Sequence, residues 1–429
     1  MSIETEILRI EAAKENIASA ISDKGITVPS NTLLDDMPAL IASIEINSGG
    51  DSGGNESGGG SSGESNNQIV GNGAIRVRFI DPIDGVFLTH MVDAGDSIDI
   101  EQITPLTHDR LTFECWSKTG SLSNIQTNTD VGAVYTTTSG NSELDYDLTN
   151  YPQGSAELPI KFVIYTTGSY VTVNWGDGQS STSSGGEFTP TNTIESGKYT
   201  LSIESDGVIS FDMNEMYSMF GYALYILTTA IRIGNNVETI PDGCFKYNTP
   251  NYITLPLSIS SIGFEAFAYS QSIENIVFPP TITQLPARVC CHSVRLQNIV
   301  INDSVLTIAY EAFKNCYGLR YVVLNNNLTA IGNNLFYNSA LVTYCKIPQS
   351  VTSIGSGFLN FDLSADEAYF PMSVLGTIDM SDAAYPPTLT GALLPVNSQT
   401  KIIIPENLLL HFGSSPTWSQ YSNRYVTVG

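Results

Sequence analysis

The chain has 429 residues, with 43 Asp and Glu against 18 Lys and Arg, which gives a formal net charge of −25. Such a surface repels nucleic acid and anionic membranes, so we expect neither as a partner. No apolar run approaches the ~20 residues of a membrane-spanning helix, and the N-terminal segment lacks the basic region and cleavage site of a signal peptide. The length favours about three domains.

Residues 1–47 are predicted to form a short helical module. Five isoleucines follow a heptad-like spacing, and Ile at both core positions favours bundles of more than two helices. These candidate oligomerisation residues are Ile3, Ile7, Ile10, Ile17 and Ile21. The alternative is a helix that packs on its neighbour within one chain. The stripe favours a homo-oligomer, for which we expect a trimer.

Residues 48–70 are rich in Gly and Ser and form a predicted linker. Such a composition is typical of a flexible chain, here with a root-mean-square reach of ~25 Å. A tether of this kind separates an anchoring end from a working end.

The next segment, residues 71–140, is predicted to form a β domain. Ile75, Val77 and Phe79 alternate with polar residues, as in a half-buried strand, and Asp84-Gly85 indicates a turn. Further strand-like runs within 155–207 indicate a small sandwich.

From residue 225 to residue 390, apolar residues recur in three registers, almost always 23 residues apart. The first register is Ile240, Ile262, Leu285, Ile308, Ile331 and Ile354. The second is Leu255, Phe278, Ile301, Leu324 and Ile347, and the third is Ile253, Ile276, Ile299, Val322 and Cys345. Registers kept over five or six units predict a solenoid, in which each unit buries its apolar edge against its neighbours.

The large aromatic residues suggest how many cores the chain has. Trp116, Trp175 and Trp418 each lie in a different predicted module. Because a small domain commonly builds its core around one large aromatic side chain, we expect three or more separate cores. The cysteines form no CxxC pair, and we expect them to act as small buried hydrophobes.

Catalytic and metal-binding motifs are not recognisable, so we expect no enzyme, no cofactor and no metal site. Cys290-Cys291-His292 resembles a metal cluster, but adjacent residues point in different directions. Cys290 is better interpreted as filling a phenylalanine position of the repeat. Asp177-Gly178 could contact calcium, although a structural turn is the preferred interpretation.

A candidate binding strip follows from the alternation in the solenoid strands. Because Ile253 and Leu255 face the core, their neighbours must leave it. The expected exposed strip is Tyr252, Thr254, Asn275, Val277, Asn298, Val300, Tyr321, Val323, Tyr344 and Lys346. Tyrosine and asparagine suit the recognition of a protein or a glycan. A surface without a ligand is the alternative.

The repeating unit resembles the BspA-type leucine-rich repeat. The residues that carry the resemblance are LPLSISSIGFEAFAYSQSI (255–273), INDSVLTIAYEAFKNCYGL (301–319) and IPQSVTSIGSGFLNF (347–361). The ending, residues 391–429, resembles the closing cap of that family, with Trp418 and Tyr421 as anchors. The resemblance implies a binding solenoid without catalysis.

Three further segments carry resemblances. Residues 71–140 resemble a Listeria–Bacteroides repeat of the internalin B type, with a β-grasp-like fold. VTVNWGDGQSS with GKYTLSI, within 155–207, resembles a polycystic-kidney-disease-type Ig-like domain. The phrase IEAAKENIASAISDKGITVPSNTLLDDMPALIASI resembles a module of phage tail and fibre proteins.

Together these patterns predict a multidomain, mainly β protein: a helical module, a β-grasp-like domain, an Ig-like sandwich, and a leucine-rich-repeat solenoid with a C-terminal cap. The first hypothesis is a phage tail or head fibre at the virion surface, attached through residues 1–47 to other virion proteins and binding a host surface protein or glycan. The alternative is a bacterial cell-surface or secreted adhesin. A glycan depolymerase is a third hypothesis, which no motif supports.

Overall fold

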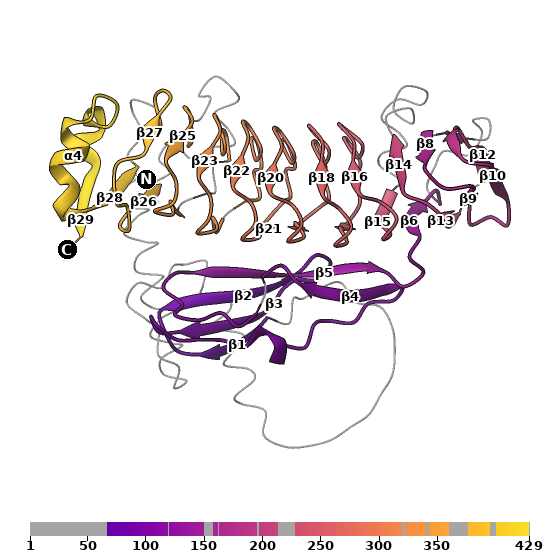
Figure 1. The fold of residues 1–429 in the computed structure, drawn as a ribbon, viewed down its shortest axis with the longest axis horizontal. Coiled ribbons are helices and arrows are strands. Elements are labelled where there is room, and N and C mark those ends of the chain that lie inside the picture. The colour runs from indigo at the N-terminus through magenta and orange to yellow at the C-terminus, as the bar shows by residue number, and fades with distance from the viewer. Residues whose placement is uncertain are drawn as a thin grey trace, which may run out of the picture. The chain divides into compact units, whose positions relative to one another are not determined.

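The computed structural model describes residues 67–118, 120–149, 158–161, 163–194, 197–212, 228–319, 322–339, 342, 344–359, 376–394 and 400–428 (Figure 1). Within these ranges the protein is mainly β, with a parallel solenoid and a short C-terminal helix. The predicted helical module and most of the linker lie outside the described residues. The chain divides into two compact units, and the larger one includes residues 131–429.

Five strands near the N-terminal end of the described chain form one sheet, in the order β1-β3-β2-β5-β4. They are β1 (Gln68–Gly71), β2 (Ile75–Asp81), β3 (Gly85–Val92), β4 (Leu111–Trp116) and β5 (Thr129–Thr137). A short 3-10 helix, η2 (Ile100–Gln102), lies between β3 and β4. Val77 and Phe79 are fully buried, as the alternation predicts, but Arg78 and Ile80 between and beside them are buried as well, so the prediction of a half-buried strand is wrong. Gly85 closes the β2–β3 turn at φ +76°, a conformation that glycine adopts without steric cost.

The region predicted to form a sandwich contains several short sheets. The largest has the order β10-β9-β13-β6-β15-β17. Its strands are β6 (Ser142–Asp147), β9 (Val171–Asn174), β10 (Ser180–Ser183), β13 (Lys198–Ser205), β15 (Thr228–Arg232) and β17 (Tyr252–Thr254). The smaller sheets contain β7 (Leu158–Lys161), β8 (Val163–Thr166), β11 (Gly186–Phe188), β12 (Thr191–Ile194) and β14 (Ile209–Asp212).

The sandwich and the solenoid share this six-stranded sheet, because β6 pairs with β15 and β15 pairs in parallel with the repeat strand β17. They also share one hydrophobic core, which contains both Trp175 and Trp418. The expectation of a separate core around each of these two tryptophans is therefore wrong. Strand β6 lies between β13 and β15 in this sheet, and its apolar residues join those of the repeats in the core.

A buried arginine joins the two parts at this junction. The Arg232 guanidinium, on β15, donates to both carboxylate oxygens of Asp145 on β6, at 2.8 and 2.6 Å. It also donates to Glu143 at 3.2 Å and to the Tyr252 hydroxyl at 2.7 Å. Bidentate pairing of this kind is among the stronger hydrogen-bonded arrangements in proteins. The cluster ties the sandwich strand to the first two strands of the repeat array.

The repeats form successive turns of parallel strands, which Figure 1 shows as a row of similar turns of the chain. In one ladder, Leu285, Ile308, Ile331, Ile354 and Leu389 are partners in neighbouring strands. The remaining repeat strands are β16 (Thr239–Ile240), β18 (Ser261–Ile262), β19 (Asn275–Val277), β20 (Gln284–Leu285), β21 (Asn298–Val300), β22 (Thr307–Ile308), β23 (Ala330–Ile331), β24 (Tyr344–Lys346), β25 (Ser353–Ile354), β26 (Thr377–Asp379) and β27 (Thr388–Leu389). The 23-residue registers thus align as the sequence predicts.

A column of phenylalanines fills the interior of the solenoid. Its buried members are Phe245, Phe267, Phe313 and Phe336. The rings of Phe245 and Phe267 stack with centroids 5.9 Å apart, and those of Phe313 and Phe336 are 6.0 Å apart. Cys290 stands at the same position of the intervening repeat and is also buried. This confirms that Cys290 occupies a phenylalanine position.

The C-terminal segment closes the last repeat. It contains β28 (Lys401–Pro405), η5 (Glu406–Leu408), α4 (Leu409–Ser414), η6 (Ser419–Arg424) and β29 (Tyr425–Val428). Trp418 is fully buried, and its indole N–H donates to the Pro387 carbonyl at 2.6 Å. The Tyr421 hydroxyl accepts from the Leu393 N–H at 2.7 Å. The two residues predicted as anchors therefore fill the core and bond to the solenoid backbone.

Removing one ring from the phenylalanine column should destabilise the whole array. We expect Phe313→Ala to lower the free energy of unfolding by about 3–5 kcal/mol, because it leaves a cavity between stacked repeats. Urea denaturation of the full chain measures this change. Tyr310→Ala is the matched control, because this ring in the same repeat is 49% exposed, and its loss should change stability by about 0.5 kcal/mol or less. Equal effects of the two changes would contradict the importance of the column.

The Arg232 cluster should make stability depend on acid. Burial raises the pKa of Asp145, but hydrogen bonds from Arg232 and Thr200 outweigh it, so the pKa lies below its usual value of 3.8. Its contribution is present above that value and is lost as the pH falls through the lowered pKa. We expect Asp145→Asn to cost about 1–3 kcal/mol near neutral pH and to flatten the loss of stability in acid. Thermal unfolding over a range of acid pH measures this. If the variant loses stability in acid as steeply as the unaltered protein does, the prediction is contradicted.

Candidate functional site

The predicted binding strip is only partly exposed. Tyr252, Asn298, Val323, Tyr344 and Lys346 are half-buried. The structure buries the other described members, which are Thr254, Asn275, Val277 and Val300. For these four, the prediction of exposure is wrong. Alternation shows which side chains leave the core of the solenoid, but it does not show whether they reach solvent. Tyr321 and the five isoleucines of the helical module lie outside the described residues.

Several polar groups of the strip are used within the protein. The Tyr344 hydroxyl donates to Asp379 at 2.5 Å, and Asn298 donates to the Asn275 side chain at 2.8 Å. Lys346 forms an ion pair with Asp382 at 2.5 Å. The strip therefore offers a ligand fewer free hydrogen-bonding groups than its sequence suggests.

A second row of side chains lies on the turns that follow the buried ladder in successive repeats. We call it the turn ladder: Tyr247, Tyr269, His292 and Asn315. The ring centroids of Tyr247 and Tyr269 are 4.7 Å apart, and those of Tyr269 and His292 are 4.4 Å apart, with the second pair of rings stacked nearly parallel. The Asn315 amide nitrogen lies 2.9 Å from Nε2 of His292. All three rings are half-buried, so they are partly accessible to a partner.

The backbone of the turn ladder is unfavourable for its aromatic residues. Tyr247, Tyr269 and His292 have φ values of +66°, +61° and +60°. In this left-handed region a residue with a bulky side chain costs about 1 kcal/mol, whereas asparagine is tolerated. The next two repeats have asparagine there, Asn315 and Asn338, at φ +57° and +59°. The first three repeats thus keep strained rings where an unstrained residue would suffice.

A chain of alternating charges flanks the turn ladder. Arg288 forms ion pairs with Glu265 at 2.6 Å and with Glu311 at 3.3 Å. Lys246 also pairs with Glu265, and Lys314 pairs with Glu311 at 3.0 Å. The Lys246 ammonium lies 5.2 and 5.5 Å from the ring centroids of Tyr247 and Tyr269. Cations thus stand against aromatic rings on a chain whose overall charge is strongly negative.

His292 is neutral within this arrangement. Burial lowers its pKa, and the neighbouring charges of Lys314 and Arg288 lower it further. An uncharged imidazole can stack on Tyr269 at neutral pH without bringing another cation to the ladder. The turn ladder is not among the predicted site residues, although its spacings of 22 and 23 residues match the solenoid period and are visible in the sequence.

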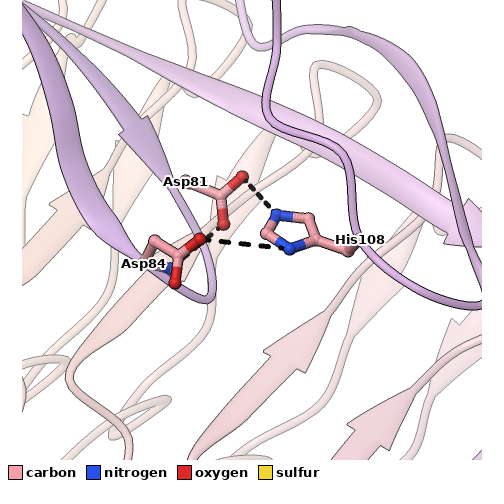
Figure 2. A group of neighbouring side chains, drawn as sticks. All are labelled: Asp81, Asp84 and His108. Atoms are coloured by element: carbon pink, nitrogen blue, oxygen red, sulfur yellow. Dashed lines mark hydrogen bonds and ion pairs between the residues drawn. The ribbon is translucent and has the colours of Figure 1, made fainter. Parts of the chain in front are cut away.

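One group of side chains has the residue types of a metal site: Asp81, Asp84 and His108 (Figure 2). One ligand atom of each residue lies within 4.8 Å of the other two, but the carboxylates approach different ring nitrogens: Asp81 Oδ2 is 2.9 Å from Nε2 of His108, and Asp84 Oδ2 is 4.0 Å from Nδ1. Asp81 Oδ1 already accepts from the backbone N–H groups of Ile83 and Asp84. The arrangement fits a histidine between two carboxylates better than a ligand set for one cation.

The side chains of the two metal candidates raised by the sequence have other partners. Cys290 is buried in the core, while His292 stacks on Tyr269. One Asp177 oxygen accepts from the Gln179 N–H within the turn, and the other accepts from Asn192 on β12, each at 2.8 Å. Within the described ranges, no helix is long and apolar enough to cross a membrane.

The chain shares its repeats with a known family. Residues 219–289 and 283–380 match the family described as BspA type leucine rich repeat region, in six copies. No curated protein matches the chain. The matched residues include all of the turn ladder and all four phenylalanines of the column.

Solved structures with leucine-rich repeats are also similar. A leucine-rich repeat protein from T. pallidum is 20% identical, with 35% of this chain and 64% of that chain covered and a TM-score of 0.25. One from Bacteroides ovatus is 21% identical, with 40% and 48% covered and a TM-score of 0.29. A leucine rich cell surface protein from Faecalibacterium prausnitzii is 17% identical, with 62% and 98% covered and a TM-score of 0.23.

The chain spans less than two thirds of the first two of these solved chains. The family match covers residues 219–380, which is less than half of the chain, and it shows that the repeats are similar to BspA-type leucine-rich repeats.

Proposed function

We propose that the protein is a non-catalytic adhesin, exposed on a bacterial cell surface or secreted, whose solenoid binds a protein or glycan on a target surface. The turn ladder is the observation that carries this proposal. Rings that lie half-buried, in a backbone conformation that disfavours them, do not serve the core. Tyrosine, the residue at two positions of the turn ladder, and arginine, present beside it as Arg288, are common among the residues that dominate binding.

The family supports the same proposal from another direction. Leucine-rich-repeat solenoids are generally binding proteins without catalysis, because their stacked turns present long, regular surfaces. The half-buried members of the strip, Tyr252, Asn298 and Tyr344, are a second proposed contact surface. Since their polar groups are partly used within the protein, we place them behind the turn ladder.

Substitutions that copy the later repeats test the turn ladder. Tyr247→Asn with Tyr269→Asn installs the residue type found at Asn315 and Asn338, so the turns should keep their shape. Binding of fluorescent full-length protein to a panel of epithelial and bacterial cells is measured by flow cytometry. We expect saturable binding that falls by about tenfold or more in the double variant, as the loss of interface hot spots does.

Controls separate the outcomes. Tyr385→Asn removes a ring that is 75% exposed and lies outside the turn ladder, so it should bind as the unaltered protein does. Protease treatment of the cells identifies a protein receptor, and periodate treatment identifies a glycan. Saturable binding to none of the cells, or release of reducing sugar from cell polysaccharide, would contradict the adhesin.

The virion hypothesis depends on residues 1–47, which lie outside the described residues, and none of the matches given above is a phage protein. Light scattering on the full chain and on a variant that begins at Gly71 tests it. A trimer that becomes a monomer on truncation would favour a fibre with an oligomeric anchor, which depends on Ile3, Ile7 and their neighbours in the stripe. If the protein is an adhesin of the bacterial surface, we expect the full chain and the truncated variant to have the same number of chains per particle.

A further inference from the structure

His108 lies between two carboxylates of one tight turn (Figure 2). Its Nε2 is 2.9 Å from Oδ2 of Asp81, which is fully buried, and its Nδ1 is 4.0 Å from Oδ2 of Asp84, which is exposed. The contact to Asp81 is a hydrogen bond, and the contact to Asp84 is at ion-pair distance. A neutral imidazole can make the hydrogen bond, but only the protonated ring also gains the electrostatic attraction of both carboxylates, and it therefore fits this place better.

Asp81 connects the charge of His108 to the shape of the turn. Its Oδ1 accepts from the backbone N–H groups of Ile83 at 2.8 Å and Asp84 at 3.2 Å. Its Oδ2 faces His108 and the Tyr135 hydroxyl, which is 2.8 Å away. A carboxylate with donors on both oxygens holds the β2–β3 turn closed. A change in the protonation of His108 therefore reaches the backbone of the turn through the Asp81 side chain.

Tyr135, on β5, extends the connection to the segment that carries His108. Its hydroxyl is 2.8 Å from the Leu106 carbonyl as well as from Asp81, and one hydroxyl proton can serve only one of them at a time. Its ring also packs edge-on against His108, with centroids 5.2 Å apart. Residues 103–110 form neither helix nor strand, so contacts at Leu106 and His108 hold a stretch without regular structure.

The surrounding charges favour the protonated ring. Asp81 and Asp84 face His108 from the turn, and Tyr135 faces it from β5. Burial lowers the pKa of His108, but the hydrogen bond to Asp81 and the negative charges of Asp81 and Asp84 outweigh it, so the pKa is raised above 6.5. A raised pKa stabilises the folded state fully below 6.5, and this stabilisation is lost as the pH rises through the raised value.

We propose that protonated His108 is a clasp that fastens residues 103–110 to the turn Asp81–Gly85, and that deprotonation releases this segment. The β domain then has a fastened form in acidic surroundings and a looser form in alkaline ones. Release of the segment exposes the Leu106 carbonyl and leaves the Asp84 carboxylate without its ion-pair partner. The clasp does not depend on the adhesin proposal, because it involves no residue of the turn ladder.

Titration of the four histidines by NMR tests the first half of the proposal. In full-length protein with labelled imidazoles, His108→Gln assigns the His108 signal. We expect His108 to titrate above 6.5 and Asp84→Asn to shift it downward. His90 is the internal control, because burial alone lowers its pKa, and it should titrate below 6.5 in all variants. A His108 that titrates at or below His90 would overturn the clasp.

Hydrogen exchange read by mass spectrometry tests the release. After correction for intrinsic rates, peptides that cover residues 81–85 and 103–110 should exchange several times faster at about pH 8 than at about pH 5.5. His108→Gln should remove this difference. Equal exchange at both pH values in the unaltered protein would refute the proposal. A zinc-dependent shift of the His108 signal that Asp84→Asn abolishes would also refute it, since the group would then be a metal site.

Discussion

The structure depends on the stacking of like residues in successive repeats. No single repeat encloses a core, because its aliphatic edge and its phenylalanine become buried only against the same positions of the next repeat. Leu285, Ile308 and Ile331 stand in register for this reason, and so do Phe313 and Phe336. Each end of the array must therefore be covered by something that is not a repeat. The β6 strand covers one end, and Trp418 with its cap covers the other.

The interior of the solenoid was predictable because its period is strict. Apolar residues 23 apart can face one core only if the chain returns to the same place once per repeat, so the three registers follow from sequence. Cys290 at a phenylalanine position could be identified for the same reason. The shared sheet could not, because the pairing of β6 with β15 joins Asp145 to residues more than 80 positions away. No local pattern records a partner at that distance.

The surface was less predictable than the core. Alternation correctly places Thr254 and Val277 outside the solenoid interior, but both are buried in the folded chain. The turn ladder has a visible spacing, yet its significance lies in backbone angles. A tyrosine at φ +61° differs from an ordinary tyrosine only in three dimensions. Likewise, Asp81 and His108 are 27 residues apart, and only the folded turn brings them together.

The sheet shared by the sandwich and the repeats has a consequence for the order of folding. Strands β6, β9, β10 and β13, which lie on one side of β15 in the sheet, all precede it in the chain. The strand with which β15 pairs, β6, is therefore made before the first repeat is synthesised. Each later repeat then needs only the one made just before it, and contacts remain local as the chain grows. During synthesis from the N-terminus, only the repeat made last therefore lacks the neighbour that covers its apolar residues.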